Sequence, residues 1–181
     1  ESIGYADYAL KQFFNDASKQ PWFNNTLFVI TPDHTSISDD DFYSTTIGQY
    51  SIPIILFNNN ITPKKEERTV QQIDILPTVL DYLNYDKPYY SLGKSMLSDN
   101  KQPAIFYVTP YYCVVQDSIF YVLNDFKITE KYNFKKDSLQ KNKLSVIEHD
   151  KEIINFSKAY IQNYTNDVIE NKMTYTLKTK K

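Results

Sequence analysis

A carboxylate and an imidazole stand side by side at Asp33 and His34, just after an apolar run that covers residues 26–31. A run of this length, rich in β-branched and aromatic residues, is typical of a strand buried on both faces of a parallel sheet. Open α/β sheets bind their ligands where such strands end. Carboxylate oxygens and imidazole nitrogens are also ligands that zinc and manganese accept. The pair therefore predicts part of a metal-assisted active site.

Other candidate catalytic residues are few. Cys113 is the single cysteine, and its strand-like surroundings favour a small buried core residue over a nucleophile. A catalytic cysteine would need a histidine base nearby, and the chain has 2 histidines, His34 and His149. His149 stands beside Asp150, just before a helical pattern. We therefore expect a surface or capping role for His149.

The spacing of apolar residues predicts the elements that must position the pair. Helices are expected at about residues 3–18, 73–83 and 150–172. Strands are expected at 26–31, 52–57 and 104–109, followed by a hairpin of 113–115 with 119–123 and a further strand within 126–134. In the second helix, the side chains expected to face inward are Ile75, Leu76, Val79, Leu80 and Leu83.

Composition limits the class of protein. Of the 181 residues, 41% are hydrophobic and 15% aromatic, which argues against disorder. The net charge of −2 argues against a nucleic-acid partner, and the one basic cluster is the tail at residues 178–181. No segment reaches the ~18 apolar residues of a membrane span, and no signal peptide is recognisable. The first residue is Glu1 rather than Met, so we expect a fragment of a longer protein.

Two blocks of sequence, taken in order, resemble a known family. They are PWFNNTLFVITPDHTS at residues 21–36 and QQIDILPT at residues 71–78, with weaker similarity at 5–14, 48–55 and 158–164. Together they resemble the C-terminal part of a sulfatase of the lipoteichoic acid synthase type, in the alkaline phosphatase superfamily. Thr35 and Ser36 follow the histidine where classical sulfatases commonly have Gly, which favours the synthase-like branch.

The resemblance implies a fold and a site. The fold would be the C-terminal portion of a sulfatase-like α/β sandwich, with a mainly parallel sheet flanked by helices. Residues 1–110 would be part of that core, and residues 111–181 would form an antiparallel hairpin and a long terminal helix packed on it. Asp33 and His34 would bind the catalytic divalent metal, with Mn, Zn, Mg and Ca not distinguished. The nucleophile would lie upstream, so this chain alone is expected to be inactive.

The resemblance also implies substrates, partners and location. Substrates would be sulfate or phosphate esters, including lipid-linked glycerol phosphate, and the partner would be the N-terminal half of the enzyme. The intact protein would be membrane-anchored with an extracytoplasmic catalytic domain, and this chain itself would be soluble. The alternative is a non-catalytic structural or interaction module that keeps the fold. A fragment should expose an apolar sheet edge or helix face where the other half docks.

Overall fold

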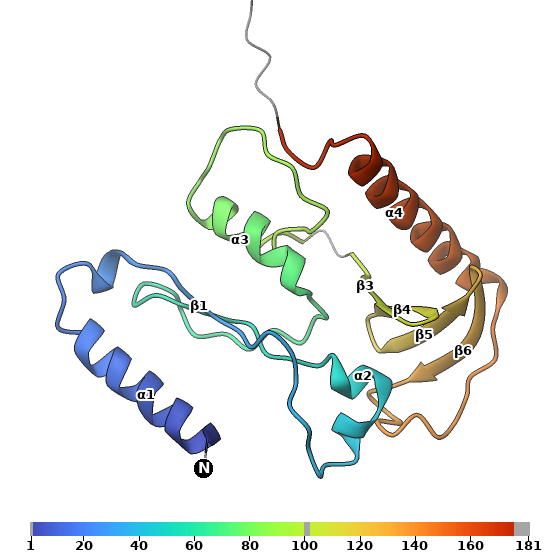
Figure 1. Cartoon of the computed structure of the whole chain (residues 1–181), viewed down its shortest axis with the longest axis horizontal. Helices are drawn as coiled ribbons and strands as arrows, with labels where there is room; N and C mark the ends of the chain where they lie inside the picture. The colour runs from blue at the N-terminus through green and yellow to red at the C-terminus, as the bar shows by residue number, and fades with distance from the viewer. Residues whose placement is uncertain (1, 100–101, 176–181) are drawn as a thin grey trace, which may run out of the picture.

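A computed structural model describes residues 2–99 and 102–175 (Figure 1). The basic tail at 178–181 lies outside the described residues. The helices are α1 (Ser2–Ala17), α2 (Thr46–Gln49), α3 (Ile75–Tyr82) and α4 (Lys151–Ile169), with short 3-10 turns at Phe23–Asn25, Phe42–Ser44, Gln72–Asp74 and Glu148–Asp150. The strands are β1 (Phe28–Ile30), β2 (Ile55–Phe57), β3 (Ala104–Val108), β4 (Tyr111–Gln116), β5 (Ile119–Asn124) and β6 (Lys127–Asn133).

Both sheets of the described residues are antiparallel, so the predicted mainly parallel sheet is wrong. In the smaller sheet β1 pairs with β2, and Ile30 lies opposite Ile55. The chain therefore leaves β1 and returns to β2 at the same end of the ribbon. Residues 31–54 form a long connection between two antiparallel strands and not the crossover that parallel strands require. The apolar run of β1 correctly indicated a strand, but composition does not specify the direction of its neighbour.

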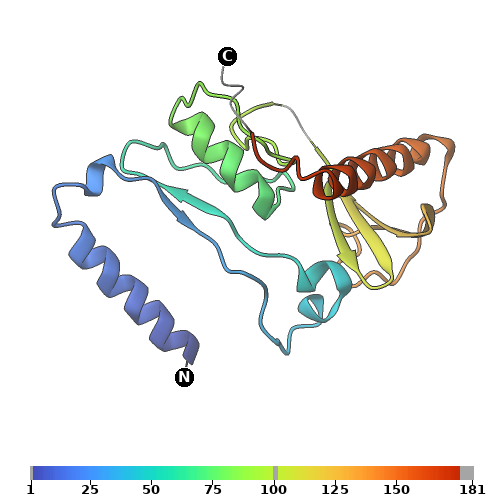
Figure 2. The same cartoon turned by 45° about the horizontal axis from the view of Figure 1, so that its top comes forward.

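The β1–β2 ribbon is half-buried, rather than buried on both faces as predicted. It consists of two strands of 3 residues each, which is too narrow to form a core alone. Aromatic rings of α1 cover part of it: the Phe14 ring lies 5.1 Å from Phe28 and 5.8 Å from Phe57, between ring centroids. Figures 1 and 2 both show the ribbon running between α1 and α3.

The main core lies in the four-stranded sheet, an antiparallel meander in the order β3-β4-β5-β6. The predicted hairpin is confirmed as β4 and β5, and β3 and β6 pair on either side of it. Because side chains alternate along a strand, the meander has two apolar faces. Ile47 of α2 packs on one face and Ile153 of α4 on the other. The division at residue 110 falls between β3 and β4 and stays a prediction.

The long terminal helix predicted from residue 150 is confirmed as α4, which lies across the meander (Figure 1). Within the described ranges, neither α4 nor another helix has the length and apolarity needed to cross a membrane. The helix predicted at the start of the chain is likewise confirmed as α1.

α3 is more exposed than its apolar pattern predicts. Leu76 is 51% exposed and Leu83 is 61% exposed, although both are predicted to face inward. The buried side of the helix includes Thr78, whose Oγ1 donates to the Asp74 carbonyl at 2.5 Å and accepts from the Met96 N–H at 2.9 Å. A polar residue therefore ties α3 to the following loop, and apolar residues of α3 face solvent.

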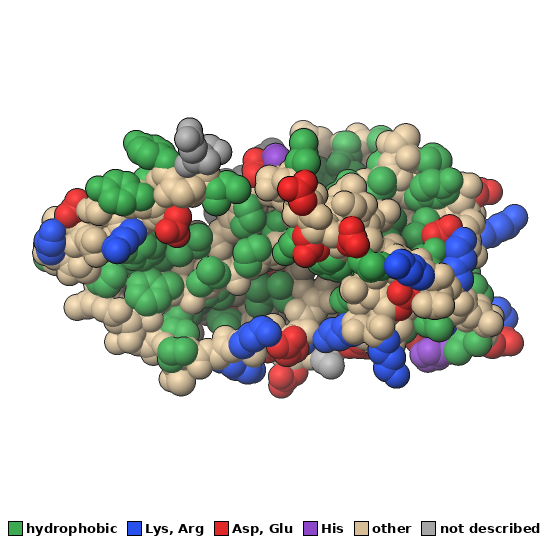
Figure 3. Space-filling view, turned by 90° about the horizontal axis from the view of Figure 1, so that it is seen from below, with side chains coloured by type: hydrophobic (Ala, Val, Ile, Leu, Met, Phe, Trp, Pro, Cys, Tyr) green, Lys and Arg blue, Asp and Glu red, His purple; other side chains and the backbone are tan. Residues whose placement is uncertain are grey.

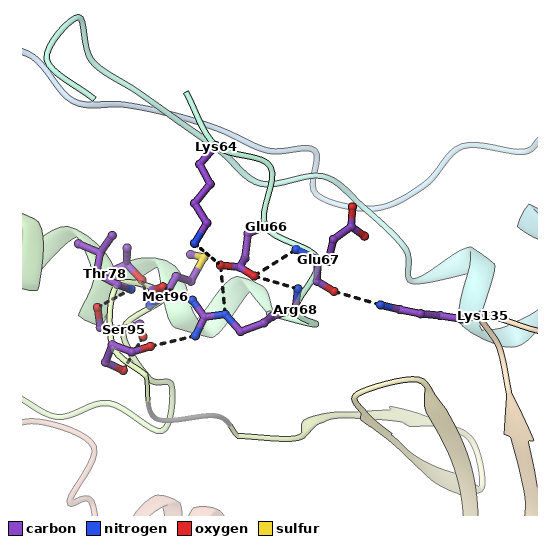
Figure 4. Close-up of polar contacts among 10 residues, drawn as sticks. Lys64, Glu66, Glu67, Arg68, Thr78, Ser95, Met96 and Lys135 are labelled. Atoms are coloured by element: carbon purple, nitrogen blue, oxygen red, sulfur yellow. Dashed lines mark hydrogen bonds and ion pairs between the residues drawn. The ribbon is translucent and has the colours of Figure 1, made fainter. Parts of the chain in front are cut away.

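Arg68 joins the segment after β2 to the loop that follows α3 (Figure 4). Its Nη1 donates to the Ser98 carbonyl at 2.9 Å, and its Nη2 donates to the Met96 carbonyl at 2.6 Å. Its Nε lies 3.3 Å from Glu66 Oε2. A guanidinium with five donors can serve several acceptors at once. These contacts hold the chain just before Gln71 and Gln72. Gln72 contacts the loop of Asp33 and His34, and Gln71 contacts β3.

Candidate metal site

Asp33 and His34 lie in the loop that directly follows β1, where the sequence places them. Their side chains are 86% and 77% exposed, respectively. The backbone N–H of His34 donates to Asp33 Oδ1 at 2.9 Å. The other carboxylate oxygen, Asp33 Oδ2, lies 3.4 Å from Nε2 of His34. One carboxylate oxygen thus orders the loop, while the other lies close to the imidazole.

The second ring nitrogen determines what His34 can offer. Nδ1 of His34 lies 2.8 Å from the Thr35 carbonyl oxygen. A carbonyl oxygen only accepts, so Nδ1 carries the proton, and in the neutral ring Nε2 then has a free lone pair. A lone pair beside a carboxylate oxygen is unfavourable unless a proton or a cation lies between them. Two ligand atoms of a tetrahedral zinc ion are about 3.4 Å apart, given metal–ligand bonds of about 2.0–2.2 Å. The spacing of the pair therefore fits a shared metal ion.

Hydrogen bonds from two other segments hold this loop. Nε2 of Gln72 donates to the carbonyl of Pro32 at 2.9 Å and to that of Asp33 at 3.3 Å. Oγ1 of Thr35 donates to the carbonyl of Gln49, at the end of α2, at 2.7 Å. The loop is thereby attached to the turn before α3 and to α2.

The block at residues 71–78 lies beside the site and connects several segments by hydrogen bonds. The buried Asp74 carboxylate accepts the backbone N–H of Gln71 at 2.9 Å and that of Lys94 at 2.8 Å. Oε1 of Gln71 accepts the N–H of Ile105 in β3 at 3.1 Å. Gln71 therefore connects this block to the meander, and its neighbour Gln72 contacts the loop that contains Asp33 and His34. The sequence marked the block as distinctive, but not this supporting role.

A hollow of about 490 Å³ opens beside the pair. Ligand sites are typically clefts of about 300–1,000 Å³. Besides Asp33 and His34, the residues that line the hollow are Thr35, Ser36, Ile37, Gln49, Tyr50, Ile52 and Gln72. Sequence reasoning did not assign Tyr50 to the site. It lies in the weakly similar block at residues 48–55, but its neighbours at the site come from distant parts of the chain.

Among the described residues, no third potential ligand joins the pair. Within residues 2–99 and 102–175, no cluster of three or more His, Cys, Asp or Glu could hold a metal ion. Catalytic zinc usually has three protein ligands, so Asp33 and His34 could form only part of such a centre. Cys113 is buried, as predicted, with 1% exposure. His149 lies at the surface, and its Nδ1 is 3.3 Å from Glu152 Oε1.

Comparisons with known proteins agree with this fold. Residues 1–85 match the family model named Sulfatase. A solved structure of a protein in the alkaline phosphatase superfamily from Vibrio parahaemolyticus superposes with a TM-score of 0.77 and 22% identity. The superposition covers 95% of this chain and 42% of the Vibrio chain. The chain therefore has an α/β fold similar to that of this alkaline phosphatase superfamily protein, and its residues 1–85 match the Sulfatase model.

A curated relative is also similar to most of this chain. Lipoteichoic acid synthase 2 of Bacillus subtilis (strain 168) is 24% identical over 166 residues, which cover 81% of this chain and 26% of the relative. The resemblance to the C-terminal part of a lipoteichoic acid synthase-like sulfatase, predicted from the sequence, is confirmed. The chain spans about a quarter of the length of this relative.

Proposed function

We propose that this chain is the C-terminal portion of a metal-dependent enzyme that acts on sulfate or phosphate esters, and that Asp33 and His34 supply two ligands of its divalent metal ion. The observation that carries the proposal is the 3.4 Å separation of Asp33 Oδ2 and His34 Nε2, within a segment that matches the Sulfatase model. The contact of Nδ1 with the Thr35 carbonyl supports it, because metal-binding histidines commonly donate their other N–H to such an acceptor.

The bound metal would lower the pKa of a hydroxyl nucleophile and neutralise charge on the transferred sulfuryl or phosphoryl group. Asp33 contributes a negative charge that attracts the cation. His34 contributes a directional bond from a neutral nitrogen, and the Thr35 carbonyl orients its ring. The nucleophile and the remaining ligands belong, in this proposal, to a segment that precedes Glu1. Sulfate-ester hydrolysis and phosphoglycerol transfer from a lipid-linked donor are both compatible with these two ligands.

Exposed apolar side chains support the need for that preceding segment. Phe13 and Ile55 are each 50% exposed, and Leu76 and Leu83 are exposed further. Figure 3 shows hydrophobic side chains gathered over the half of the molecule that contains α1. Monomeric proteins rarely leave large apolar patches uncovered. Since the chain spans 42% of its structural neighbour, we assign the cover to the missing sulfatase-like half. The intact protein would be membrane-anchored, with this portion outside the cytoplasm.

The coding sequence upstream of Glu1 is the first test. We expect a continuous reading frame that encodes a sulfatase-like segment with a Thr, Ser or Cys nucleophile after a strand. An in-frame stop codon directly before Glu1 would contradict the proposal. A continuous frame without a nucleophile would favour the alternative, a non-catalytic module with the same fold.

Metal binding is the second test. We expect isothermal titration of the chain with zinc or manganese to show weak binding that is lost in Asp33→Ala and in His34→Ala. His149→Ala is a matched control, because His149 and Glu152 form a similarly exposed histidine–carboxylate pair. Binding that is equal in all three variants would refute the assignment. Micromolar or tighter binding, lost in Asp33→Ala, would instead show that this chain holds a complete site.

A further inference from the structure

Tyr50 lies where the hollow meets the meander. Its side chain is 48% exposed and lines the same hollow as Asp33 and His34. Its ring stacks on Phe106 of β3, with centroids 4.3 Å apart and ring planes at 26°. Phe106 lies outside residues 1–85, which match the Sulfatase model. A residue beyond the matched segment thus supports one wall of the candidate site.

The stack continues from Phe106 into the core. The Phe106 and Phe120 rings are 6.4 Å apart and nearly parallel, at 9°. The Phe120 and Tyr132 rings are also 6.4 Å apart, at 20°. Phe120 is completely buried, and Tyr132 is 5% exposed. Tyr50 is therefore the exposed end of an aromatic row that is anchored in the meander, so its ring has a defined orientation.

The backbone around Tyr50 is held as well. Ile47, in the helix just before it, is buried in the core with 5% exposure. The carbonyl of Gln49 accepts the Thr35 hydroxyl, next to the candidate metal ligand His34. The ring of Tyr50 is thus held against the core by Phe106, and the residue before it is held to the loop of Asp33 and His34 by the Thr35 hydroxyl.

We propose that Tyr50 binds the alcohol portion of the ester whose acid group lies at the metal. This inference rests on the proposed function and specifies the class of substrate. The Tyr50 ring, with Ile52 beside it in the lining, offers carbon surface that inorganic sulfate or phosphate cannot use. The fitting ligand is an ester whose alcohol part presents a flat carbon face, such as a sugar ring or an aryl group.

The charges around the hollow imply that the acid group and the alcohol part of such a ligand bind at different places. Its lining residues include the Asp33 carboxylate and no Lys or Arg. An anionic group therefore has no side-chain cation to bind there and depends on the metal. The alcohol part depends on the Tyr50 ring and not on the metal, so a neutral probe can report on Tyr50 alone.

The test is a titration of the full chain, with zinc present, followed by amide chemical shifts. The probes are 4-nitrophenyl sulfate, neutral 4-nitrophenyl β-glucoside and inorganic sulfate. We expect both aryl probes to shift the amides of Gln49, Ser51 and Ile52, and we expect sulfate not to shift them. Tyr50→Ala should weaken aryl binding roughly fivefold or more, and Tyr50→Phe should retain it, because the ring makes the contact. Tyr43→Ala is the matched control, since Tyr43 is 41% exposed and lies outside the lining.

A second variant tests the support from the meander. Phe106→Leu keeps apolar volume but removes the stacking ring, and it should weaken aryl binding while the other amide signals stay in place. Unchanged binding in Tyr50→Ala, equal weakening in Tyr43→Ala, or no shift near Tyr50 would overturn the inference. Asp33→Ala separates the two proposals. If Asp33→Ala loses metal binding but still binds the glucoside, the ion lies at Asp33 and the alcohol part binds independently of it. If the native chain binds the metal but aryl binding does not depend on Tyr50, the Tyr50 assignment alone is refuted.

Discussion

The Nζ atom of Lys131, in β6, lies 2.8 Å from Oδ2 and 2.9 Å from Oδ1 of Asp150, at the start of α4. The two side chains are 9% and 3% exposed. The same carboxylate accepts the hydroxyl of Tyr121 at 3.2 Å and the N–H of Ile147 at 2.7 Å. One buried carboxylate therefore joins the last two strands of the meander to the first turn of the terminal helix.

Removing either partner of this ion pair should strongly destabilise the fold. We expect Lys131→Met and Asp150→Ala each to lower the free energy of unfolding by about 3–5 kcal/mol, because the remaining charge stays buried without its partner. Urea denaturation followed by circular dichroism measures the change. Lys151→Ala is the control, because Lys151 pairs with Glu148 at the surface, and it should change stability by about 0.5 kcal/mol or less. Single variants as stable as this control would show that the pair is not buried in solution.

Asp150 should also make stability depend on acid pH. Burial opposes ionisation, but the Ile147 N–H and the Lys131 ammonium outweigh it and hold the pKa of Asp150 below its ordinary value of 3.8. Because the folded-state pKa is the lower one, the stabilisation is present above pH 3.8 and is lost as the pH falls through the folded-state value. Denaturation midpoints from about pH 5 to about pH 2 should fall less steeply for Asp150→Asn than for the native chain. Equal slopes would contradict this assignment.

Cys113 should be inert in the folded protein. Burial, with a smaller contribution from Glu130, raises the pKa of its thiol to about 12. The thiolate is the reactive form, so we expect Ellman's reagent at about pH 8 to label Cys113 only when the chain unfolds. Ser36→Cys provides an exposed thiol for comparison and should react at once. Fast labelling of Cys113 in the native chain would argue against the packing of β4.

Gln72 should affect metal binding without touching the metal. Its side chain holds the carbonyls of Pro32 and Asp33, so Gln72→Ala frees the loop that carries the two ligands. Loss of such supporting contacts typically weakens metal affinity by about 10–100-fold. We expect weaker zinc binding by calorimetry and an unchanged unfolding midpoint. Gln49→Ala is the control, because its side chain makes a long contact with the Ser44 carbonyl at 3.5 Å. A similar loss in both variants would mean that Gln72 has no special role.

The elements that the sequence predicted correctly are those whose signal is local. The helical spacing of Ile153, Ser157 and Tyr160 identified α4, and the apolar stretches around Gln116–Ile119 identified the β4–β5 hairpin. Position of the candidate ligands was also predictable, since Asp33 and His34 directly follow a strand in the sequence. Errors arose where a residue's environment depends on distant segments. Leu76 and Leu83 follow an apolar pattern, yet in the described chain no element covers them, and Thr78 is buried instead.

By itself, the order of residues determined that a carboxylate and an imidazole would lie in the loop just after a strand, because neighbours in sequence are neighbours in space. Only the tertiary structure decided that β1 pairs antiparallel with β2, and that Tyr50 rests on Phe106 beside the site. Strand direction and ring stacking depend on contacts between segments far apart in the chain. Such contacts exist only after the chain has closed its long loops, so no local pattern encodes them.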